Sequence, residues 1–157
     1  MKKTIFYNCI LLLSAVLFIS TGCSSNDDDE LFNTASEIAS INDNASSGTW
    51  IITYYYDTDH EETSNFTGYS FTFGSNGILT ASNGVNIYTG SWSVTDDSSS
   101  STSSSDDIDF NIAFSSPPDF EELTEDWEIT SHTSTKIVLK DISGGNGETD
   151  FLTFERN

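Results

Sequence analysis

The sequence predicts an all-β fold, a small antiparallel barrel of eight short strands with one short helix. Apolar and polar residues alternate with a period of two through most of the chain after residue 44, as in strands that have one buried face. Turn sequences rich in Gly, Asn and Ser separate these segments, which favours local hairpins. Because closure removes the exposed edges of such a meander, we expect a barrel rather than two stacked sheets.

Residues 1–22 have the layout of a secretory signal peptide. Lys2 and Lys3 precede the mostly apolar run Ile5–Ile19, and small residues follow up to Cys23. The apolar run is shorter than the roughly 20 residues with which a helix crosses a bilayer. We therefore expect cleavage of this segment rather than a permanent transmembrane anchor.

The end of this segment resembles a bacterial lipobox, in which small residues precede a cysteine that receives a diacylglycerol. Thr21, Gly22 and Cys23 match that pattern, whereas Ser20 stands where the family usually has Leu. The resemblance implies a lipid anchor on Cys23, with an ordinary signal peptide as the alternative. Cys9 would be removed with the signal, so the mature chain could form no internal disulfide.

Residues 23–44 are expected to form a disordered acidic tether. The run Asp27–Glu30 repels itself and cannot be buried, and at most a helical turn is expected in "TASEIASI". An acidic run just after the cysteine also resembles the export signal of Bacteroidota surface lipoproteins. That resemblance implies a lipid-anchored protein of the outer membrane that faces the cell surface, with a periplasm-facing lipoprotein as the alternative.

The charge of the chain limits its partners. Without residues 1–22 the chain keeps 25 acidic and three basic residues, a formal charge of −22. Nucleic acid and anionic membrane surfaces are disfavoured as partners because they carry the same sign of charge. We expect the membrane to be contacted through the lipid anchor.

The barrel domain is expected over residues 45–157 and begins with a strand over Gly48–Tyr56. Strict alternation would place Trp50, Ile52, Tyr54 and Tyr56 on one face. This strand is rich in β-branched and aromatic residues, as strands with a buried face are.

Two hairpins follow the first strand. The strand Tyr69–Phe73 is joined to Ile78–Ser82 by Gly74–Gly77, and Asn83-Gly84 leads into a strand over Asn86–Val94. Glycine and asparagine supply the positive φ angles that tight hairpin turns require.

The second half of the domain begins after a low-complexity loop over residues 95–107. An alternating strand over Asp107–Phe114 comes next, and Pro117-Pro118 opens a helix of one or two turns. Three further strands are expected at Asp126–Thr130, Lys136–Ile142 and Asp150–Arg156.

Two segments at the ends of the domain carry a family resemblance. Gly48-Thr49-Trp50 is similar to the Gly-x-Trp that opens lipocalins and related calycin barrels, and Arg156 stands where those proteins keep a basic residue. The middle lipocalin motif is not visible. The layout of the domain from Gly48 to Arg156 resembles the lipocalin-like domains of Bacteroidota surface lipoproteins. This resemblance implies that Trp50 closes one end of the barrel and that Arg156 stacks on it as a structural pair.

The interior of such a barrel suggests a binding function. We expect Tyr54, Phe71, Tyr88, Trp92 and Phe110 to line it, and a small hydrophobic molecule or a glycan could bind in its mouth. The alternative is a solid barrel, filled by these side chains, that serves as a structural or accessory module and contacts a partner protein through its loops.

No catalytic or metal site is expected. The sequence has no Gly-x-Ser-x-Gly elbow, and neither His60 nor His132 has the spacing of a catalytic triad. The acidic loop Asp57–Thr63 offers oxygen ligands but lacks the glycine and the later glutamate of an EF-hand, so we expect a solvated loop. The prediction is a non-enzymatic protein without a cofactor.

Overall fold

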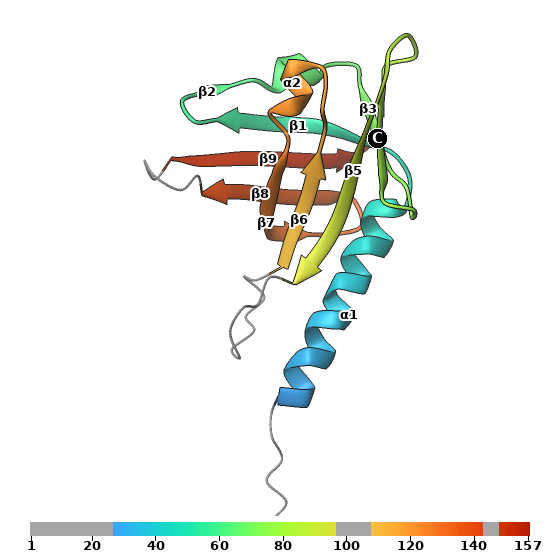
Figure 1. Cartoon of the computed structure of the whole chain (residues 1–157), viewed down its shortest axis with the longest axis vertical. Coiled ribbons are helices and arrows are strands. Elements are labelled where there is room, and N and C mark those ends of the chain that lie inside the picture. Colours follow the sequence, from blue (N-terminus) through green and yellow to red (C-terminus); the bar gives the residue numbers. More distant parts are fainter. Residues whose placement is uncertain (1–26, 97–107, 143–147) are drawn as a thin grey trace, which may run out of the picture.

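The computed structural model describes residues 27–96, 108–142 and 148–157, and Figure 1 shows its elements. They are α1 (Asp27–Ser46), β1 (Trp50–Asp57), β2 (His60–Glu61), η1 (Thr63–Phe66), β3 (Ser70–Phe73), β4 (Ile78–Ser82), β5 (Ile87–Asp96), β6 (Ile108–Ala113), α2 (Pro118–Glu121), β7 (Glu125–His132), β8 (Lys136–Ile142) and β9 (Thr149–Arg156). The predicted signal peptide, Cys23 and most of the predicted low-complexity loop lie outside the described residues.

The strands form a closed antiparallel barrel. From β3 to β9 each strand pairs with the next along the chain, and β1 pairs with both β3 and β9, which completes the ring. The two-residue strand β2 pairs with β1 outside this ring. The predicted eight-stranded barrel with a short helix, α2, is therefore confirmed.

A glycine allows two neighbouring strands of the barrel to approach closely. A Cβ atom at Gly90 of β5 would lie 2.3 Å from the carbonyl oxygen of Ala113, at the end of β6. Because no side chain fits there, Gly90 is required by strand packing rather than by a turn.

A bulge in β1 reverses which side chains face the interior. The register with β9 shifts between Ile52 and Tyr54, so Trp50 and Ile52 point inward, whereas after the shift Tyr55 does. Tyr55 is 1% exposed and Tyr54 is 40% exposed. The prediction that Tyr54 and Tyr56 share the inner face with Trp50 is wrong, because one extra residue in a strand moves every later side chain to the opposite face.

Aromatic side chains fill the barrel interior. Nine of them are at most 2% exposed: Trp50, Tyr55, Phe66, Phe71, Phe73, Phe110, Phe120, Trp127 and Phe154. The ring of Phe73 makes edge contacts with Trp92, Phe110 and Phe154 at centroid distances of 5.2–5.3 Å. Such edge-to-face pairs stabilise the core beyond the burial of their area.

The short elements η1 and α2 cover one end of the barrel. Phe66 of η1 and Phe120 of α2 meet edge to face, 5.3 Å apart. The Tyr55 hydroxyl donates a hydrogen bond to the Glu122 carbonyl at 3.0 Å, and the Trp127 indole N–H donates to the Leu123 carbonyl at 3.1 Å. These bonds fix the chain after α2 on the core.

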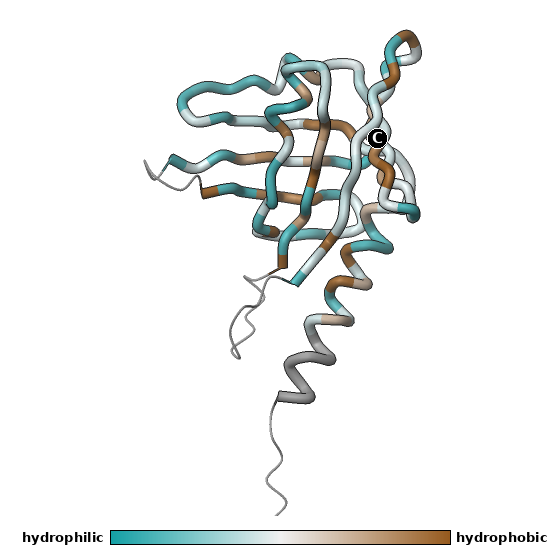
Figure 2. The backbone as a smooth tube through the Cα atoms, viewed as in Figure 1, coloured by the Kyte–Doolittle hydropathy of each residue, from teal (hydrophilic) through white to brown (hydrophobic). Residues whose placement is uncertain are grey.

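The long helix α1 packs on the barrel near the start of β1. Ile41 and Ala45 are buried, and the Trp50 indole N–H donates to the Ala45 carbonyl at 2.8 Å. Figure 1 shows that the N-terminal part of α1 extends beyond the barrel, and Figure 2 shows apolar and polar positions alternating along its docked part. The folded unit therefore begins before residue 45.

The predicted disordered tether over 23–44 is wrong from Asp27 onward. A run of acids does repel itself, but Asp27–Glu30 form the first turn of α1. The partial positive charge at a helix N-terminus favours acidic residues there. Farther along, burial of Ile41 and Ala45 against the barrel stabilises the helix.

Arg156 lies over Trp50 where α1 ends. Its Cζ atom is 5.1 Å from the centre of the indole, and its guanidinium donates to the Asn44 carbonyl at 3.1 Å and to Ser47 Oγ at 3.3 Å. Gly48 adopts φ +100° beside this guanidinium, a conformation that favours glycine. Arg156 thus joins the last strand to the C-terminal end of α1.

Candidate functional site

The residues predicted to line a binding cavity belong to the packed core, with one exception. Phe71 and Phe110 have no exposed surface, and Trp92 stacks on Phe110 at 5.6 Å. Tyr88 is half-buried and packs against Phe120 at 4.9 Å. Tyr54 lies on the outer face of β1, so its predicted place in the interior is wrong.

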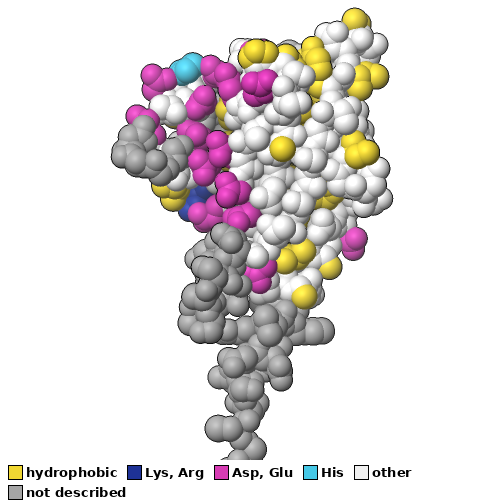
Figure 3. Space-filling view, viewed as in Figure 1, with side chains coloured by type: hydrophobic (Ala, Val, Ile, Leu, Met, Phe, Trp, Pro, Cys, Tyr) yellow, Lys and Arg dark blue, Asp and Glu magenta, His cyan; other side chains and the backbone are white. Residues whose placement is uncertain are grey.

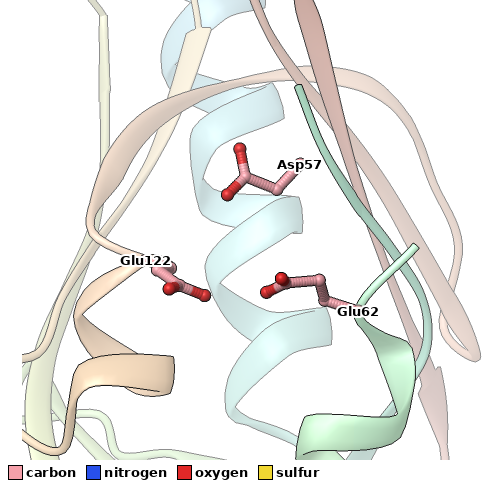
Figure 4. A group of neighbouring side chains, drawn as sticks. All are labelled: Asp57, Glu62 and Glu122. Atoms are coloured by element: carbon pink, nitrogen blue, oxygen red, sulfur yellow. The ribbon is translucent and has the colours of Figure 1, made fainter. Parts of the chain in front are cut away.

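Three carboxylates converge beside the end covered by α2 (Figure 4). Asp57 ends β1, Glu62 precedes η1 and Glu122 follows α2, and their nearest oxygen atoms all lie within 4.8 Å of one another. Among the described residues, these three side chains form the group whose carboxylates could together hold a cation. The sequence placed Asp57 and Glu62 in one acidic loop but gave no reason to add Glu122, because α2 brings it there from a distant segment.

Asp57, Glu62 and Glu122 form an acidic cluster, and crowding changes the ionisation of Glu122 within it. Partial desolvation of the carboxyl raises the pKa of Glu122 to about 7, although the residue as a whole is exposed. A hydrogen bond to Glu62 and the charges of Glu62 and Asp57 add to the rise. Glu122 therefore changes its protonation state within the physiological pH range.

His60 borders the acidic cluster. Its imidazole contacts the carboxylate of Asp59 and lies 2.5 Å from that of Glu62. Hydrogen bonds to Asp59 and Glu62 raise the pKa of His60, although the side chain is exposed. A protonated imidazole next to Glu62 offsets part of the negative charge.

The negative charge continues beyond the cluster. Figure 3 shows acidic side chains gathered on the side of the molecule where β1 and β8 end. Burial raises the pKa of Glu125, and the charges of Asp141, Asp126 and Asp150 add to this effect. The acidic side chains thus act on one another across several strands.

Two grooves flank α1 where it packs on the barrel. The α1–β5 groove has a volume of about 360 Å³. It is lined by Asn42, Asp43 and Ser46 of α1, Ser75 and Gly77 of the β3–β4 turn, and Trp92, Ser93 and Val94 of β5.

The α1–β7 groove, on the other side of the helix, has a volume of about 350 Å³ and includes Ile41, Ile129 and His132. His132 Nε2 lies 2.7 Å from the Glu37 carboxylate, and its Nδ1 lies 3.4 Å from the Asn44 amide nitrogen. His132, the last residue of β7, therefore connects this strand to α1. Neither groove followed from the sequence analysis, because α1 itself was not predicted.

Comparison with known proteins gives one structural likeness. No family model matches the sequence, and no curated protein matches it. A crystal structure of a DUF4847 family protein from Bacteroides vulgatus is similar, with 17% sequence identity and a TM-score of 0.47. The match covers 74% of this chain and 97% of that chain.

Among the described residues, no helix combines the length and apolar character needed to cross a membrane.

Proposed function

We propose that this chain is a non-enzymatic lipoprotein of the cell envelope whose lipocalin-like barrel is a solid interaction module. The observation that carries this proposal is the filled interior, in which aromatic rings such as Phe71 and Phe110 have no exposed surface. Cavities that hold a ligand in a barrel need interior volume free of side chains. The filled core therefore favours an interaction module over a protein that holds a hydrophobic ligand inside the barrel.

The hydrogen-bond partners of the histidines support a non-enzymatic role. His132 contacts Glu37 and Asn44, and His60 contacts Asp59 and Glu62. A histidine that activates a nucleophile would lie within hydrogen-bond reach of a serine, threonine or cysteine side chain. The partners of His132 lie on α1, so this histidine joins β7 to the helix, whereas those of His60 are its neighbours in the same loop.

The lipid anchor is proposed from the sequence around Cys23, and α1 gives it a structural context. The helix begins four residues after Cys23, and its 20 residues correspond to a length of roughly 30 Å. Its C-terminal part is fixed to the barrel through Ile41 and Ala45. A helix anchored in this way would act as a spacer between the lipid and the barrel.

Replacing the proposed lipidated cysteine tests the anchor. The whole protein with Cys23→Ala should leave the membrane fraction, because no acyl chains would then hold it there. The matched control is Cys9→Ala, which changes a cysteine of the signal peptide and should leave the protein in the membrane fraction. Continued membrane association of Cys23→Ala from which residues 1–22 have been removed would refute lipid anchoring.

We further propose that the anchored protein faces the cell surface, on the evidence of the acidic run Asp27–Glu30. Changing these four residues to alanine, a strong helix former, should keep α1 but leave the barrel beyond the reach of protease added to intact cells. The control is alanine at two exposed acids of the barrel, Glu61 and Glu121, which should not alter cleavage. If both variants and the wild type are cleaved equally, the run Asp27–Glu30 is not the export signal.

A further inference from the structure

We propose that the α1–β5 groove is a binding site for a small neutral saccharide. The groove lies outside the filled core, between the C-terminal half of α1, the β3–β4 turn and β5. Its volume of about 360 Å³ is within the lower part of the range of ligand pockets, about 300–1,000 Å³. This inference goes beyond the proposed function and does not depend on the lipid anchor.

Five of the eight residues that line the groove carry polar side chains, which can pair with the hydroxyl groups of a ligand. Asp43 and Ser75 are exposed there, so a ligand can reach the carboxylate and the hydroxyl. An ionised carboxylate accepts several hydrogen bonds, and a serine hydroxyl both donates and accepts. Neighbouring hydroxyl groups of a sugar need acceptors and donors in this kind of combination.

The helix holds two further polar groups in fixed positions. The Asn42 amide nitrogen donates to the Ile38 carbonyl at 2.9 Å, and the Ser46 hydroxyl donates to the Asn42 carbonyl at 2.7 Å. The Ser46 hydroxyl hydrogen and one of the two Asn42 amide hydrogens are used within α1, whereas both side-chain oxygens keep acceptor capacity. The α1 side of the groove is therefore rich in acceptors, which matches the hydroxyl donors of a saccharide.

Trp92 contributes a narrow, rigidly held apolar edge to the groove, because little of the residue is exposed. Its indole N–H donates to the Gly74 carbonyl at 2.9 Å, and its ring stacks on Phe110 and meets Phe73 edge to face. Only 7% of the residue is exposed, and it lines the groove. A sugar ring has apolar C–H faces as well as hydroxyls, so an aromatic side chain beside polar groups suits both of its surfaces.

The lining disfavours other ligand classes. None of the residues that line the groove is Lys or Arg, and the chain carries a formal charge of −20, so a phosphate or carboxylate ligand would meet repulsion from Asp43. A wholly apolar ligand would remove water from the polar side chains without replacing their hydrogen bonds, which is costly. A neutral polyhydroxylated ligand meets neither penalty.

Ligand titration by NMR tests the site in the whole protein, solubilised in a detergent whose headgroup is not a sugar. The probes are maltose, cellobiose, lactose and chitobiose, with spermidine as a cationic probe. We expect at least one disaccharide to bind in the millimolar range or tighter. Asp43→Ala should weaken that binding about tenfold, because a hydrogen bond to a charged group is lost.

A second pair of variants separates the groove from the rest of the surface. Ser75→Trp places a bulky side chain in the groove and should abolish disaccharide binding, whereas Ser134→Trp makes the same change in the exposed β7–β8 turn and should leave it intact. The proposal is overturned if no disaccharide binds, if Asp43→Ala and Ser75→Trp both bind as the wild type does, or if spermidine alone binds. Loss of binding in Cys23→Ala is not expected, so failure of the anchor would not count against the groove.

Discussion

Glu122 is a residue whose ionisation opposes the fold. Its pKa of about 7 in the folded protein lies above the ordinary value of 4.5, so the folded state binds this proton more tightly than the unfolded state does. The associated stability is fully present below pH 4.5 and is lost as the pH rises through 7. Because Glu122 is exposed, solvent reduces the cost, which we put at about 1 kcal/mol.

Glu122→Gln should therefore stabilise the protein at pH 8 by about 1 kcal/mol, or roughly 4 °C in Tm, and should have little effect at pH 4. Thermal unfolding at both pH values measures this difference. The control is Glu121→Gln, which changes the exposed neighbour outside the acidic cluster. Loss of stability in Glu122→Gln at pH 8 would contradict the repulsion inferred for the cluster.

Arg156 is a residue at which charge, stacking and hydrogen bonds coincide. Lysine keeps the charge but loses the planar donors to Asn44 and Ser47, so Arg156→Lys should lower the free energy of unfolding by about 1–2 kcal/mol. Lys136→Ala, which removes an exposed ion pair with Glu155, should cost less than about 1 kcal/mol. Denaturant unfolding ranks the two variants, and equal costs would mean that Arg156 is an ordinary surface cation.

At the scale of the element, the bulge in β1 decides which of two adjacent tyrosines is structural. Tyr55→Ala removes a buried ring and a hydrogen bond to the Glu122 carbonyl, and should cost about 3–5 kcal/mol. Tyr54→Ala removes an outer side chain and should change stability by about 0.5 kcal/mol or less. If Tyr54→Ala lowered the free energy of unfolding more than Tyr55→Ala in denaturant unfolding, the unbroken alternation predicted from the sequence would be correct.

The packing of α1 on the barrel leads to a similar prediction about stability. Ile41→Ala removes a buried side chain and should cost about 2–5 kcal/mol of unfolding free energy, whereas Ser40→Ala changes its exposed neighbour and should be nearly neutral. Near-wild-type unfolding of Ile41→Ala would show that the helix is not part of the folded unit.

The elements differ in how far local sequence specifies them. The hairpin strands around Gly74–Gly77 and Asn83-Gly84 were predictable, because alternation and turn residues act over a few positions. The bulge before Tyr54 was not, because it depends on pairing with the distant strand β9. The same holds for α1 and for Glu122, since contacts with the barrel stabilise the helix and α2 brings Glu122 to the acidic cluster.

At the scale of the whole molecule, the two covered ends of the barrel differ in chemistry. The acidic cluster lies beside the end that η1 and α2 cover, whereas α1 and its two grooves lie near the start of β1. If the proposed lipid precedes α1, the α1 side faces the membrane and the acidic side points away from it. That orientation keeps the acidic cluster away from anionic lipids, which would repel it, whereas the run Asp27–Glu30 lies close to the proposed anchor.

Native mass spectrometry of the protein extracted from membranes tests the central claim, a lipid-anchored barrel with a filled interior. We expect one mass, that of the chain from Cys23 with covalently attached acyl chains. No hydrophobic molecule should co-purify with it. A chain that retains residues 1–22, a chain without acyl chains, or a barrel that carries a hydrophobic ligand would contradict this expectation.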